Sequence, residues 1–193
     1  MSAILAVCGD AFCAMVSDGR MAEEPVLDGK PRILTEKLPK VRKLNRNVCV
    51  GFAGDTLAAV QILNALDEYD VRCLTLERTV RILQRKGRET PCQPVGVRLL
   101  VGGRGRKGGF MLAGLGSDRQ YEAQARPAAP GTYLIEGACS HTGIAPFLER
   151  YVRPAAASWR SLEEIAATLD GCIAAIAAQD PTVNTTLFRE LVR

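Results

Sequence analysis

The chain has 193 residues, of which 47% are hydrophobic, and its 25 basic and 21 acidic side chains give a formal charge of +4 at pH 7. This composition predicts one globular domain over residues 1–193 with a full hydrophobic core. The interspersed charges give no sign of a nucleic-acid or membrane partner, and no apolar run reaches the roughly 18 residues that cross a bilayer.

The cysteines and the N-terminal apolar stretch bear on where the protein resides. That stretch lacks the basic flank of a signal peptide and is interrupted by Gly9-Asp10. No cysteine pair has CxxC spacing, and His141 is the one histidine that could share a metal site with them. We therefore expect a cytoplasmic protein with buried reduced thiols, rather than metal ligands or disulfides. The seven positions are Cys8, Cys13, Cys49, Cys73, Cys92, Cys139 and Cys172.

The N-terminal residues predict a β-hairpin. Two apolar runs flank the Gly-Asp pair, which suits a two-residue turn, so antiparallel strands are expected over about 2–8 and 11–17. With that turn, Ser2 faces Ser17, and Asp18 lies beside the start of the chain. Both strands are apolar at nearly every position, which predicts cover on both faces of their sheet.

The next segments predict a loop, a second hairpin and a helix. Residues 19–39 are rich in glycine and proline and are expected to form a loop with one irregular strand. Strands over 40–44 and 47–54 form the second hairpin. A helix follows, with Asp55 or Thr56 as its N-cap, and ends near Asp70. Its expected apolar stripe is Leu57, Val60, Leu63 and Leu66.

The second half of the chain repeats the pattern of helices and strands. A second helix is expected over about 75–88. The remaining elements are strands over 95–103, 108–115, 119–124 and 132–137, helices near 140–153 and 161–179, and a short strand around 183–188. Helix pairs outside two stacked sheets would form a four-layer αββα sandwich, an α+β fold that also explains the doubly buried first hairpin.

Ser2 is a candidate nucleophile. Methionine is usually removed when the next residue is as small as serine, which would leave Ser2 with both a hydroxyl and a free α-amine. An α-amine has an unperturbed pKa of roughly 7.7–8.0, so it can accept the hydroxyl proton near neutral pH. The alternative is that serine is only a tolerated second residue.

Four features follow one another along the chain. They are Ser2, the pair Asp18-Gly19 at the end of the second strand, Lys40 before a short basic strand, and the segment Val50-Gly51-Phe52-Ala53-Gly54-Asp55-Thr56. Together they resemble the proteasome β subunit and the HslV-like peptidases of the N-terminal nucleophile hydrolases, in which threonine holds the first position. Residues 100–103 and 109–112 resemble a later hairpin of that family, so that the resemblance covers most of the chain.

The resemblance implies a role for each of these residues. Ser2 would attack a peptide carbonyl while its own α-amine moves the proton. Lys40 would disfavour protonation of that amine, and Asp18 would hold Lys40 in an ion pair. Gly51 would donate its backbone N–H to the oxyanion, and Ala53 would line a roomy pocket for the residue before the scissile bond. The alternatives are a solvated basic strand around Lys40 and simple close packing at Gly51.

Near the C-terminus the sequence departs from the family pattern. Asp180 resembles a late aspartate that helps to position the terminal amine. However, a family serine three residues later is Val183 here, and the serine of a Gly-Ser-Gly turn is Ala138, with Ser140 as the nearest substitute. These departures concern the supporting hydrogen bonds more than the nucleophile.

Two other motifs receive structural interpretations. The glycine-rich segment 102–109 lacks the Lys-Ser/Thr ending and the following helix of a phosphate loop, and we interpret it as a hairpin turn rather than as a phosphate-binding or RNA-binding tract. His141 cannot form a catalytic triad with the adjacent Ser140, because neighbouring side chains diverge.

The resemblance implies a peptidase that needs no metal or organic cofactor. We expect a cytoplasmic homo-oligomer resembling a proteasome-type ring, which takes peptides or unfolded chains as substrate and is fed by a separate ATPase. Two alternatives stay open. A retained Met1 would bury the amine in a peptide bond and leave a catalytically inactive structural or regulatory subunit, and a monomeric chain would favour a small-molecule amidase of the same superfamily.

Overall fold

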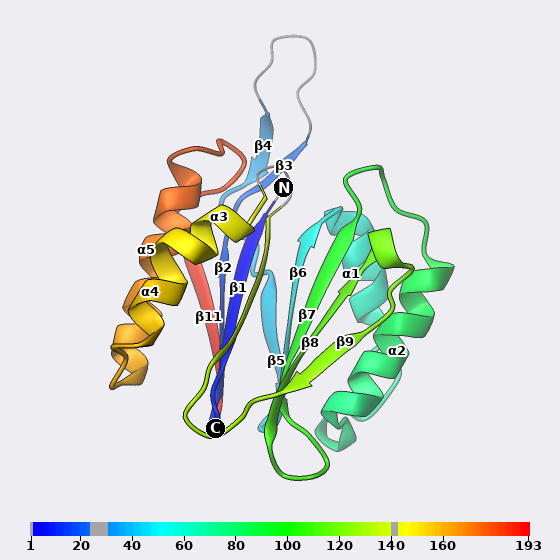
Figure 1. Cartoon of the computed structure of the whole chain (residues 1–193). Helices are drawn as coiled ribbons and strands as arrows, with labels where there is room; N and C mark the ends of the chain where they lie inside the picture. The colour runs from blue at the N-terminus through cyan, green and yellow to red at the C-terminus, as the bar shows by residue number, and fades with distance from the viewer. Residues whose placement is uncertain (1, 24–30, 140–142) are drawn as a thin grey trace.

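A computed structural model describes residues 2–23, 31–139 and 143–193. Within them, antiparallel strands form a four-stranded, a five-stranded and a two-stranded sheet. The four-stranded sheet has the order β10-β1-β2-β11, so its inner strands form the N-terminal hairpin (Figure 1). Its strands are β1 (Ala3–Cys8), β2 (Cys13–Asp18), β10 (Leu134–Cys139) and β11 (Leu187–Val192).

The N-terminal hairpin has a different turn from the one expected. Gly9 N–H donates to the carbonyl of Phe12 at 3.0 Å, so the two residues between them, Asp10 and Ala11, form the turn. Ser17 consequently pairs with Ile4 rather than with Ser2. Because this shift moves the register by two residues, each side chain keeps its predicted face. Asp18 still lies beside the start of the chain.

The five-stranded sheet has the order β5-β6-β7-β8-β9. Its strands are β5 (Val41–Asn45), β6 (Val48–Gly54), β7 (Val97–Arg104), β8 (Phe110–Gly116) and β9 (Gln124–Pro127). The expected second hairpin and the 95–103 and 108–115 strands are confirmed. The expected strand over 119–124 is wrong: a 3-10 turn, η2 (Ser117–Arg119), precedes Gln120 and Tyr121, whose φ values of 50° and 57° interrupt an extended backbone.

Residues 19–39 contain a hairpin of their own. Strands β3 (Met21–Glu23) and β4 (Arg32–Thr35) pair in the two-stranded sheet, where the sequence predicted a loop with a single irregular strand. The expected strand at 183–188 begins later, at Leu187, and pairs with β2.

Two helices cover the five-stranded sheet. They are α1 (Thr56–Asn64) and α2 (Leu76–Glu89), separated by the 3-10 turn η1 (Val71–Cys73). Asp55 is the α1 N-cap and accepts hydrogen bonds from the N–H groups of Leu57 and Ala58. This helix turns Ala58, Ala59, Ile62 and Leu63 toward the core. The predicted stripe is therefore wrong in part, because Leu57 is 66% exposed and Val60 38% exposed, and the helix ends well before Asp70.

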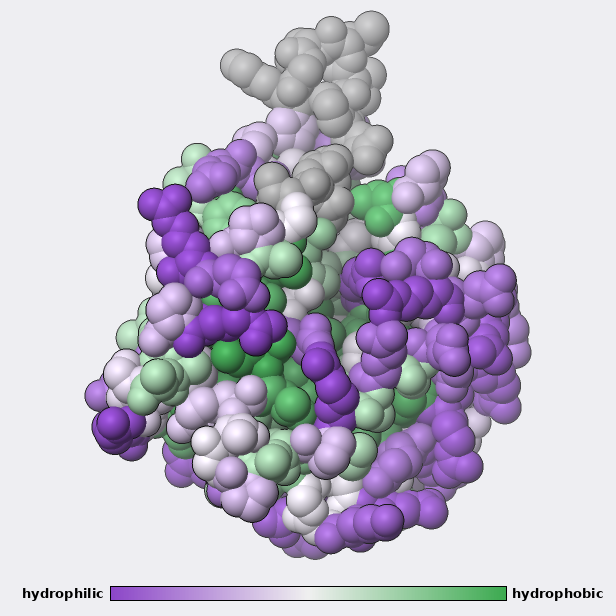
Figure 2. Space-filling view, viewed as in Figure 1, coloured by the Kyte–Doolittle hydropathy of each residue, from purple (hydrophilic) through white to green (hydrophobic). Residues whose placement is uncertain are grey.

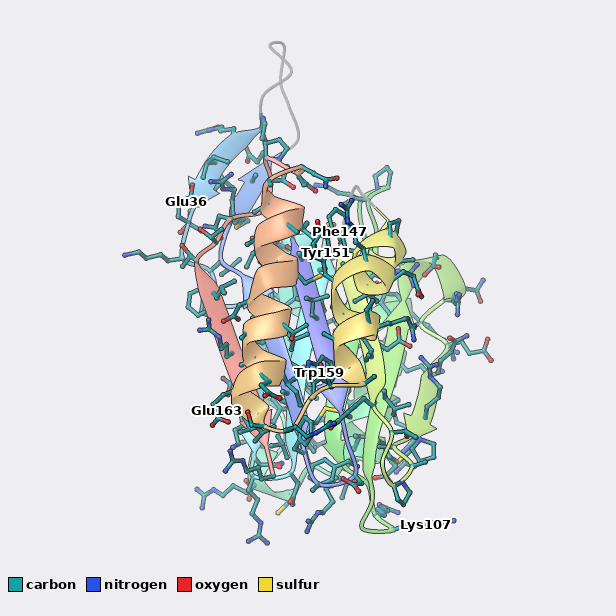
Figure 3. The ribbon with its side chains drawn as sticks, turned by 60° about the vertical axis from the view of Figure 1, so that its left-hand side comes forward. Glu36, Lys107, Phe147, Tyr151, Trp159 and Glu163 are labelled. Atoms are coloured by element: carbon teal, nitrogen blue, oxygen red, sulfur yellow. A yellow bond between two sulfur atoms is a disulfide. The ribbon has the colours of Figure 1, made fainter. Side chains whose placement is uncertain are left out.

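The C-terminal helices pack against the four-stranded sheet (Figure 3). The segments α3 (Ala145–Phe147), η3 (Leu148–Val152, a π-helix) and α4 (Arg153–Ala156) form one continuous helical run. The expected residues 140–142 of this helix lie outside the described part. Helix α5 (Leu162–Ala177) starts where the capping box predicted, since Glu164 N–H donates to Ser161 Oγ at 3.2 Å.

Buried apolar side chains form three clusters that account for the layering in Figure 1. One lies between α1, α2 and the five-stranded sheet, another between α5, the α3–α4 run and the four-stranded sheet. The third contains β1 and β2 residues such as Ile4 and Met15 together with Val41 and Leu100, so the two sheets pack face to face. Both faces of the first hairpin are therefore covered, as predicted. No described helix is long and apolar enough to cross a membrane.

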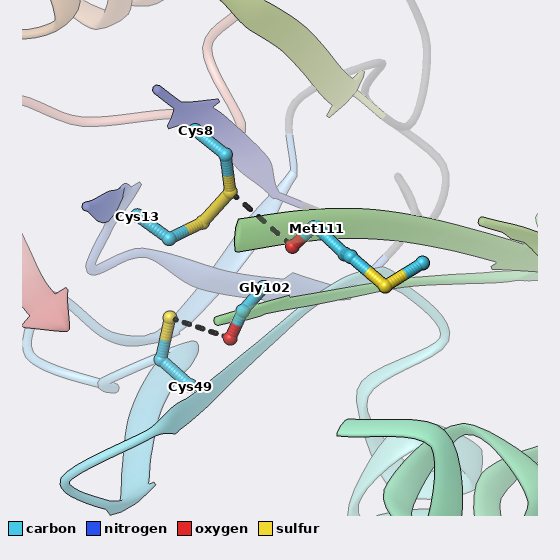
Figure 4. The surroundings of a disulfide bond; sticks show 5 residues. All are labelled: Cys8, Cys13, Cys49, Gly102 and Met111. Carbon is cyan, nitrogen blue, oxygen red and sulfur yellow. Dashed lines mark hydrogen bonds between the residues drawn. A yellow bond between two sulfur atoms is a disulfide. The ribbon is translucent and has the colours of Figure 1, made fainter. Parts of the chain in front are cut away.

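Cys8 and Cys13 form a disulfide, which corrects the expectation of reduced thiols at these two positions (Figure 4). They pair directly across β1 and β2 with their Cα atoms 4.1 Å apart. The turn expected from sequence would have placed Cys8 opposite Ala11, so the wrong register hid the pairing. Cys49 and Cys172 are buried thiols, as expected, and Cys49 Sγ donates to the carbonyl of Gly102 at 3.5 Å.

Candidate active site

Asp18 and Lys40 form an ion pair that is fully buried between the two large sheets. Asp18 ends β2, and Lys40 directly precedes β5. The Lys40 Nζ atom lies 2.6 Å from Asp18 Oδ1, with both side chains 0% exposed. It also donates to the carbonyl of Arg20 at 2.6 Å. Burying two charges is costly unless further hydrogen bonds satisfy them, and this pair has such bonds.

The Asp18 carboxylate also holds the first strand. Its Oδ1 atom accepts a hydrogen bond from Ala3 N–H at 2.8 Å, and its Oδ2 atom accepts one from Arg20 N–H at 2.9 Å. Ser2, which immediately precedes Ala3, is 0% exposed. One carboxylate thus connects the residue after Ser2 with Lys40, and the structure brings together the three residues that the sequence singled out.

Burial changes the acidity of Lys40. Desolvation is the largest effect and lowers the pKa of its ammonium group, while the neighbouring Asp18 carboxylate acts in the opposite direction. Perturbed titratable groups of this kind concentrate at functional sites, although ion pairs with a purely structural role show them too.

The loop after α5 forms hydrogen bonds with the residues that follow Asp18. Asn184 accepts a hydrogen bond from Gly19 N–H at 2.9 Å and donates to the carbonyl of Glu36 at 3.0 Å. Arg20 forms an ion pair with the Glu36 carboxylate at 3.0 Å and donates to the carbonyl of Pro181. A Cβ atom at Gly19 would come within 2.6 Å of the Glu36 carbonyl, so this close approach requires glycine. Glu36 is labelled beside the β3–β4 hairpin in Figure 3.

Asp180 reaches the first strand through a cysteine. Its Oδ1 atom accepts hydrogen bonds from the N–H and hydroxyl groups of Thr182 at 2.9 and 2.5 Å. Its Oδ2 atom lies 3.8 Å from Cys139 Sγ, which donates to it. Cys139 pairs with Ala3 in the β10–β1 register. The Cys139 side chain therefore connects Asp180 to β1, the strand that follows Ser2.

The two glycines of the 51–54 segment direct their N–H groups differently. Phe52 N–H donates to the carbonyl of Lys40 at 2.9 Å. Because N–H directions alternate along a strand, Gly51 N–H points the other way, toward Leu100 in β7. Gly54 N–H again points to the β5 side of the sheet. Strand β5 begins at Val41, opposite Gly51, so it does not extend far enough to pair with Gly54. Gly54, with φ of +98°, therefore presents its N–H at a sheet edge, whereas that of Gly51 lies within the sheet.

A groove of about 450 Å³ opens beside Gly54, between the β3–β4 hairpin and the start of α1. Its lining residues are Met21, Ala22, Glu23, Leu34, Gly54, Asp55, Thr56, Leu57, Gln93 and Val95. Ala53, expected to line a substrate pocket, is only 1% exposed and belongs to the core between the sheets. The structure thus does not bring Ala53 into this groove.

The surroundings of several residues were not predicted from the sequence. Val183 and Ala138, which stand where the family has serines, are buried in the apolar clusters. Met1, Ser140 and His141 lie outside the described residues. Sequence reasoning assigned no role to Cys139, Asn184 or Thr182. The one feature that could have indicated Thr182 and Asn184 is a group of polar residues around Asp180, in a segment between two apolar elements.

Comparisons with known proteins bear on the fold. No protein-family model matches this sequence, and no curated protein matches it. Among solved structures, HslV from Trypanosoma brucei has a TM-score of 0.62 and 15% identity, with 99% of each chain covered. Anbu, described as an ancestral β-subunit, from Yersinia bercovieri has a TM-score of 0.73 and 15% identity, with 98% of this chain and 80% of that chain covered. The chain shares the fold of HslV and Anbu.

A second Anbu structure supports the same conclusion. The Gly-1 mutant from Hyphomicrobium sp. strain MC1 has a TM-score of 0.72 and 13% identity, covering 100% of this chain and 82% of that one. At such identities the likeness to HslV and Anbu establishes the fold, while activity has to be argued from the site itself.

Proposed function

We propose that this protein is an N-terminal nucleophile peptidase, with the Ser2 hydroxyl as nucleophile after removal of Met1. The observation that carries the proposal is the buried Asp18–Lys40 ion pair, whose carboxylate also binds Ala3 N–H. A fold does not need a dry ion pair at the start of its first strand, and apolar residues of similar size are often as stable there. We therefore assign this buried charge a role in a catalytic site rather than in stability alone.

The proposed reaction splits amide hydrolysis into two steps. The Ser2 α-amine takes the proton of the Ser2 hydroxyl, and the hydroxyl oxygen attacks the substrate carbonyl to form a tetrahedral oxyanion. When the C–N bond breaks, the α-ammonium returns its proton to the leaving amine, and an ester remains on Ser2. Water then attacks the ester with the same amine as base, which releases the acid and restores the hydroxyl.

Lys40 and a glycine N–H would supply the electrostatic part of catalysis. The Lys40 ammonium would disfavour protonation of the Ser2 amine and stabilise the developing negative charge. For the oxyanion, the direction of the N–H groups favours Gly54 over Gly51 as the donor. Asp180 would orient the terminal strand through Cys139.

The groove beside Gly54 would receive the substrate. Its mixture of apolar side chains from β3, β4 and α1 fits an extended peptide better than a single small polar molecule. We further propose a single domain over residues 1–193 with a four-layer αββα arrangement, supported by the three core clusters. A cytoplasmic homo-oligomer of ring type, with unfolded chains as substrate and a separate ATPase, completes the proposal by analogy with the fold.

Two alternatives predict different behaviour. An inactive structural or regulatory subunit would retain Met1, and a small-molecule amidase would be a monomer that ignores peptides. Neither is favoured by an observation comparable to the buried ion pair at the first strand.

Covalent labelling tests the proposal. The protein is incubated with a peptide that carries an electrophilic carbonyl, and the modified residue is mapped by mass spectrometry. We expect one adduct on Ser2, absent in Ser2→Ala and much reduced in Lys40→Met, whereas Lys43→Met, which alters an exposed lysine in the adjoining strand β5, labels normally. A folded protein that acquires no adduct on Ser2 would contradict the proposed activity.

A further inference from the structure

An open groove on the outer side of α2 is lined by arginines. It measures about 530 Å³ and is separate from the groove beside Gly54. Its lining residues are Tyr69, Arg78, Arg81, Ile82, Arg85 and Arg106. Figure 2 shows that hydrophilic residues cover the side of the molecule on which α2 lies in Figure 1. None of the residues proposed for catalysis lines this groove.

Two elements build the arginine groove. Arg78, Arg81 and Arg85 share one face of α2, because residues three, four and seven positions apart lie above one another on a helix. Arg106 comes from the β7–β8 turn, the glycine-rich segment that the sequence singled out. Its backbone N–H donates to Glu77 Oε1 at 2.8 Å, which fixes the turn against α2.

Tyr69 orients two of these arginines. The Arg78 guanidinium lies over the Tyr69 ring, 5.0 Å from its centroid. Arg85 donates from Nη2 to the Tyr69 hydroxyl oxygen at 3.2 Å. Both guanidinium groups are thereby held in place while each keeps further N–H donors for another partner.

No guanidinium group of the groove forms an ion pair in the described part of the chain, and the Glu77 carboxylate, bound to the Arg106 backbone N–H, acts on the Arg106 charge without such a contact. No ion pair within 4.0 Å involves Arg78, Arg81, Arg85 or Arg106, and no carboxylate lines the groove. Glu68 and Glu89 act on Arg85 only at longer range. Like charges gathered in this way repel one another, and an anion that enters between them removes the repulsion.

We propose that this groove binds an acidic segment of a protein partner, whose Asp and Glu carboxylates pair with the guanidinium groups. Guanidinium forks match carboxylates in bidentate geometry. The alternative anion, a nucleic acid, is less well matched, because Arg78 already covers the Tyr69 ring on which a base would stack. The net charge of the chain is only +4, and its acidic and basic residues are interspersed, so it offers no long basic surface for a phosphate backbone.

Fluorescence anisotropy with the full chain tests the site. The probe is a short labelled polyglutamate peptide, titrated at low and at moderate salt. We expect binding that weakens with salt and that falls by about tenfold or more in the double variant R81E/R85E, since each change replaces an attraction with a repulsion. The control is R150E, an exposed arginine in η3 on the opposite helical layer, for which we expect a change of less than about twofold.

Two further measurements keep the result interpretable. R81Q/R85Q removes the charges without reversing them and should give an intermediate loss, and circular dichroism melting should show that all variants stay folded. Equal loss in R150E, or no loss in R81E/R85E, would overturn the proposal. So would tighter binding of a single-stranded oligonucleotide of equal charge through the same arginines. None of these outcomes depends on whether Ser2 is catalytic.

Discussion

At the scale of single residues, the buried Asp18–Lys40 pair is the most consequential feature. The hairpin pattern placed Asp18 beside the start of the chain, whereas Lys40 was singled out by the resemblance to the proteasome family, since the residues alone favoured a solvated basic strand. Cys139 and Asn184 could not be predicted in the same way. They reach the site from β10 and from the loop after α5, so their positions depend on pairings between distant parts of the chain.

Breaking the ion pair should destabilise the protein strongly. We expect Asp18→Asn or Lys40→Met to lower the free energy of unfolding by about 3–5 kcal/mol, because each leaves a buried charge without its partner. The double variant should lose clearly less than the sum of the two. Urea denaturation measures all three.

An exposed ion pair provides the control for this cycle. Arg189 and Asp170 contact each other at 2.6 Å, but the arginine side chain is 50% exposed, so Asp170→Asn should cost less than about 1 kcal/mol. If Asp18→Asn and Asp170→Asn lowered the free energy of unfolding by the same small amount, burial would not strengthen the Asp18–Lys40 pair as we expect.

The lowered pKa of Lys40 predicts how stability depends on pH. Below the folded-state pKa, both the folded and the unfolded chain carry the lysine proton. Between that value and the usual 10.5, only the unfolded chain binds it, so the free energy of unfolding should rise with pH across this window relative to Lys40→Met. Urea midpoints measured at several alkaline pH values test this, and a wild-type minus variant difference that falls with pH would be incompatible with it.

At the scale of secondary-structure elements, the sequence predicted most strands and helices but not the register of the first hairpin. Alternation fixes which face a side chain occupies, and a shift by two residues preserves it. Turn position, in contrast, is set by local hydrogen bonds such as Gly9 to Phe12. The missed disulfide follows from that one difference, since Cys8 and Cys13 oppose each other only in the observed register.

Removing the disulfide should destabilise the first hairpin. A short closed loop of this kind contributes about 2 kcal/mol by restricting the unfolded chain, and we expect a loss of that order in C8A/C13A. The exposed Cys73→Ala is the control and should be neutral. Both sulfurs are buried, so a reductant should act on the native protein only slowly. Thiol counting with and without denaturant measures this, and rapid reduction of the folded protein would argue against the buried disulfide.

Gly54 should be far less tolerant of substitution than Gly51. A Cβ atom at Gly54 would lie 2.2 Å from the carbonyl of Gly96, and its φ of +98° disfavours other residues. At Gly51 the nearest atom would be a Val41 methyl at 3.1 Å, which can move. We expect Gly54→Ala to cost more than about 2 kcal/mol and Gly51→Ala less than about 1 kcal/mol. Denaturation of the two variants side by side checks this ranking, and the reverse order would contradict the strand assignment.

At the scale of the whole molecule, the order of helices and strands predicted a mixed fold of sheets and helices, which the likeness to HslV and Anbu supports. Each element could be recognised from its own periodicity, and apolar strands required cover on both faces. Strand order was beyond such reasoning, because β10 and β11 flank the first hairpin from more than a hundred residues away. The hairpin in residues 19–39 was missed for another reason, since the five glycines and prolines spread along that segment favour turns.

The proposed homo-oligomer should be visible in solution. Ile33 on β4 and Val60 on α1 are large apolar side chains that are 39% and 38% exposed, and we propose that a subunit contact buries them. We expect sedimentation velocity to show an assembly larger than a monomer, weakened in I33E/V60E. Y151E, which alters a side chain exposed to a similar 36%, should leave it intact. A wild-type monomer at high concentration would be evidence against a ring.

The most direct test of the catalytic account is the intact mass of the purified protein. The proposed base is the α-amine of Ser2, and this group exists only if Met1 has been removed. We expect a mass that corresponds to a chain beginning at Ser2. A chain that retains Met1 would contradict it, because the nitrogen of Ser2 would then be an amide without basicity.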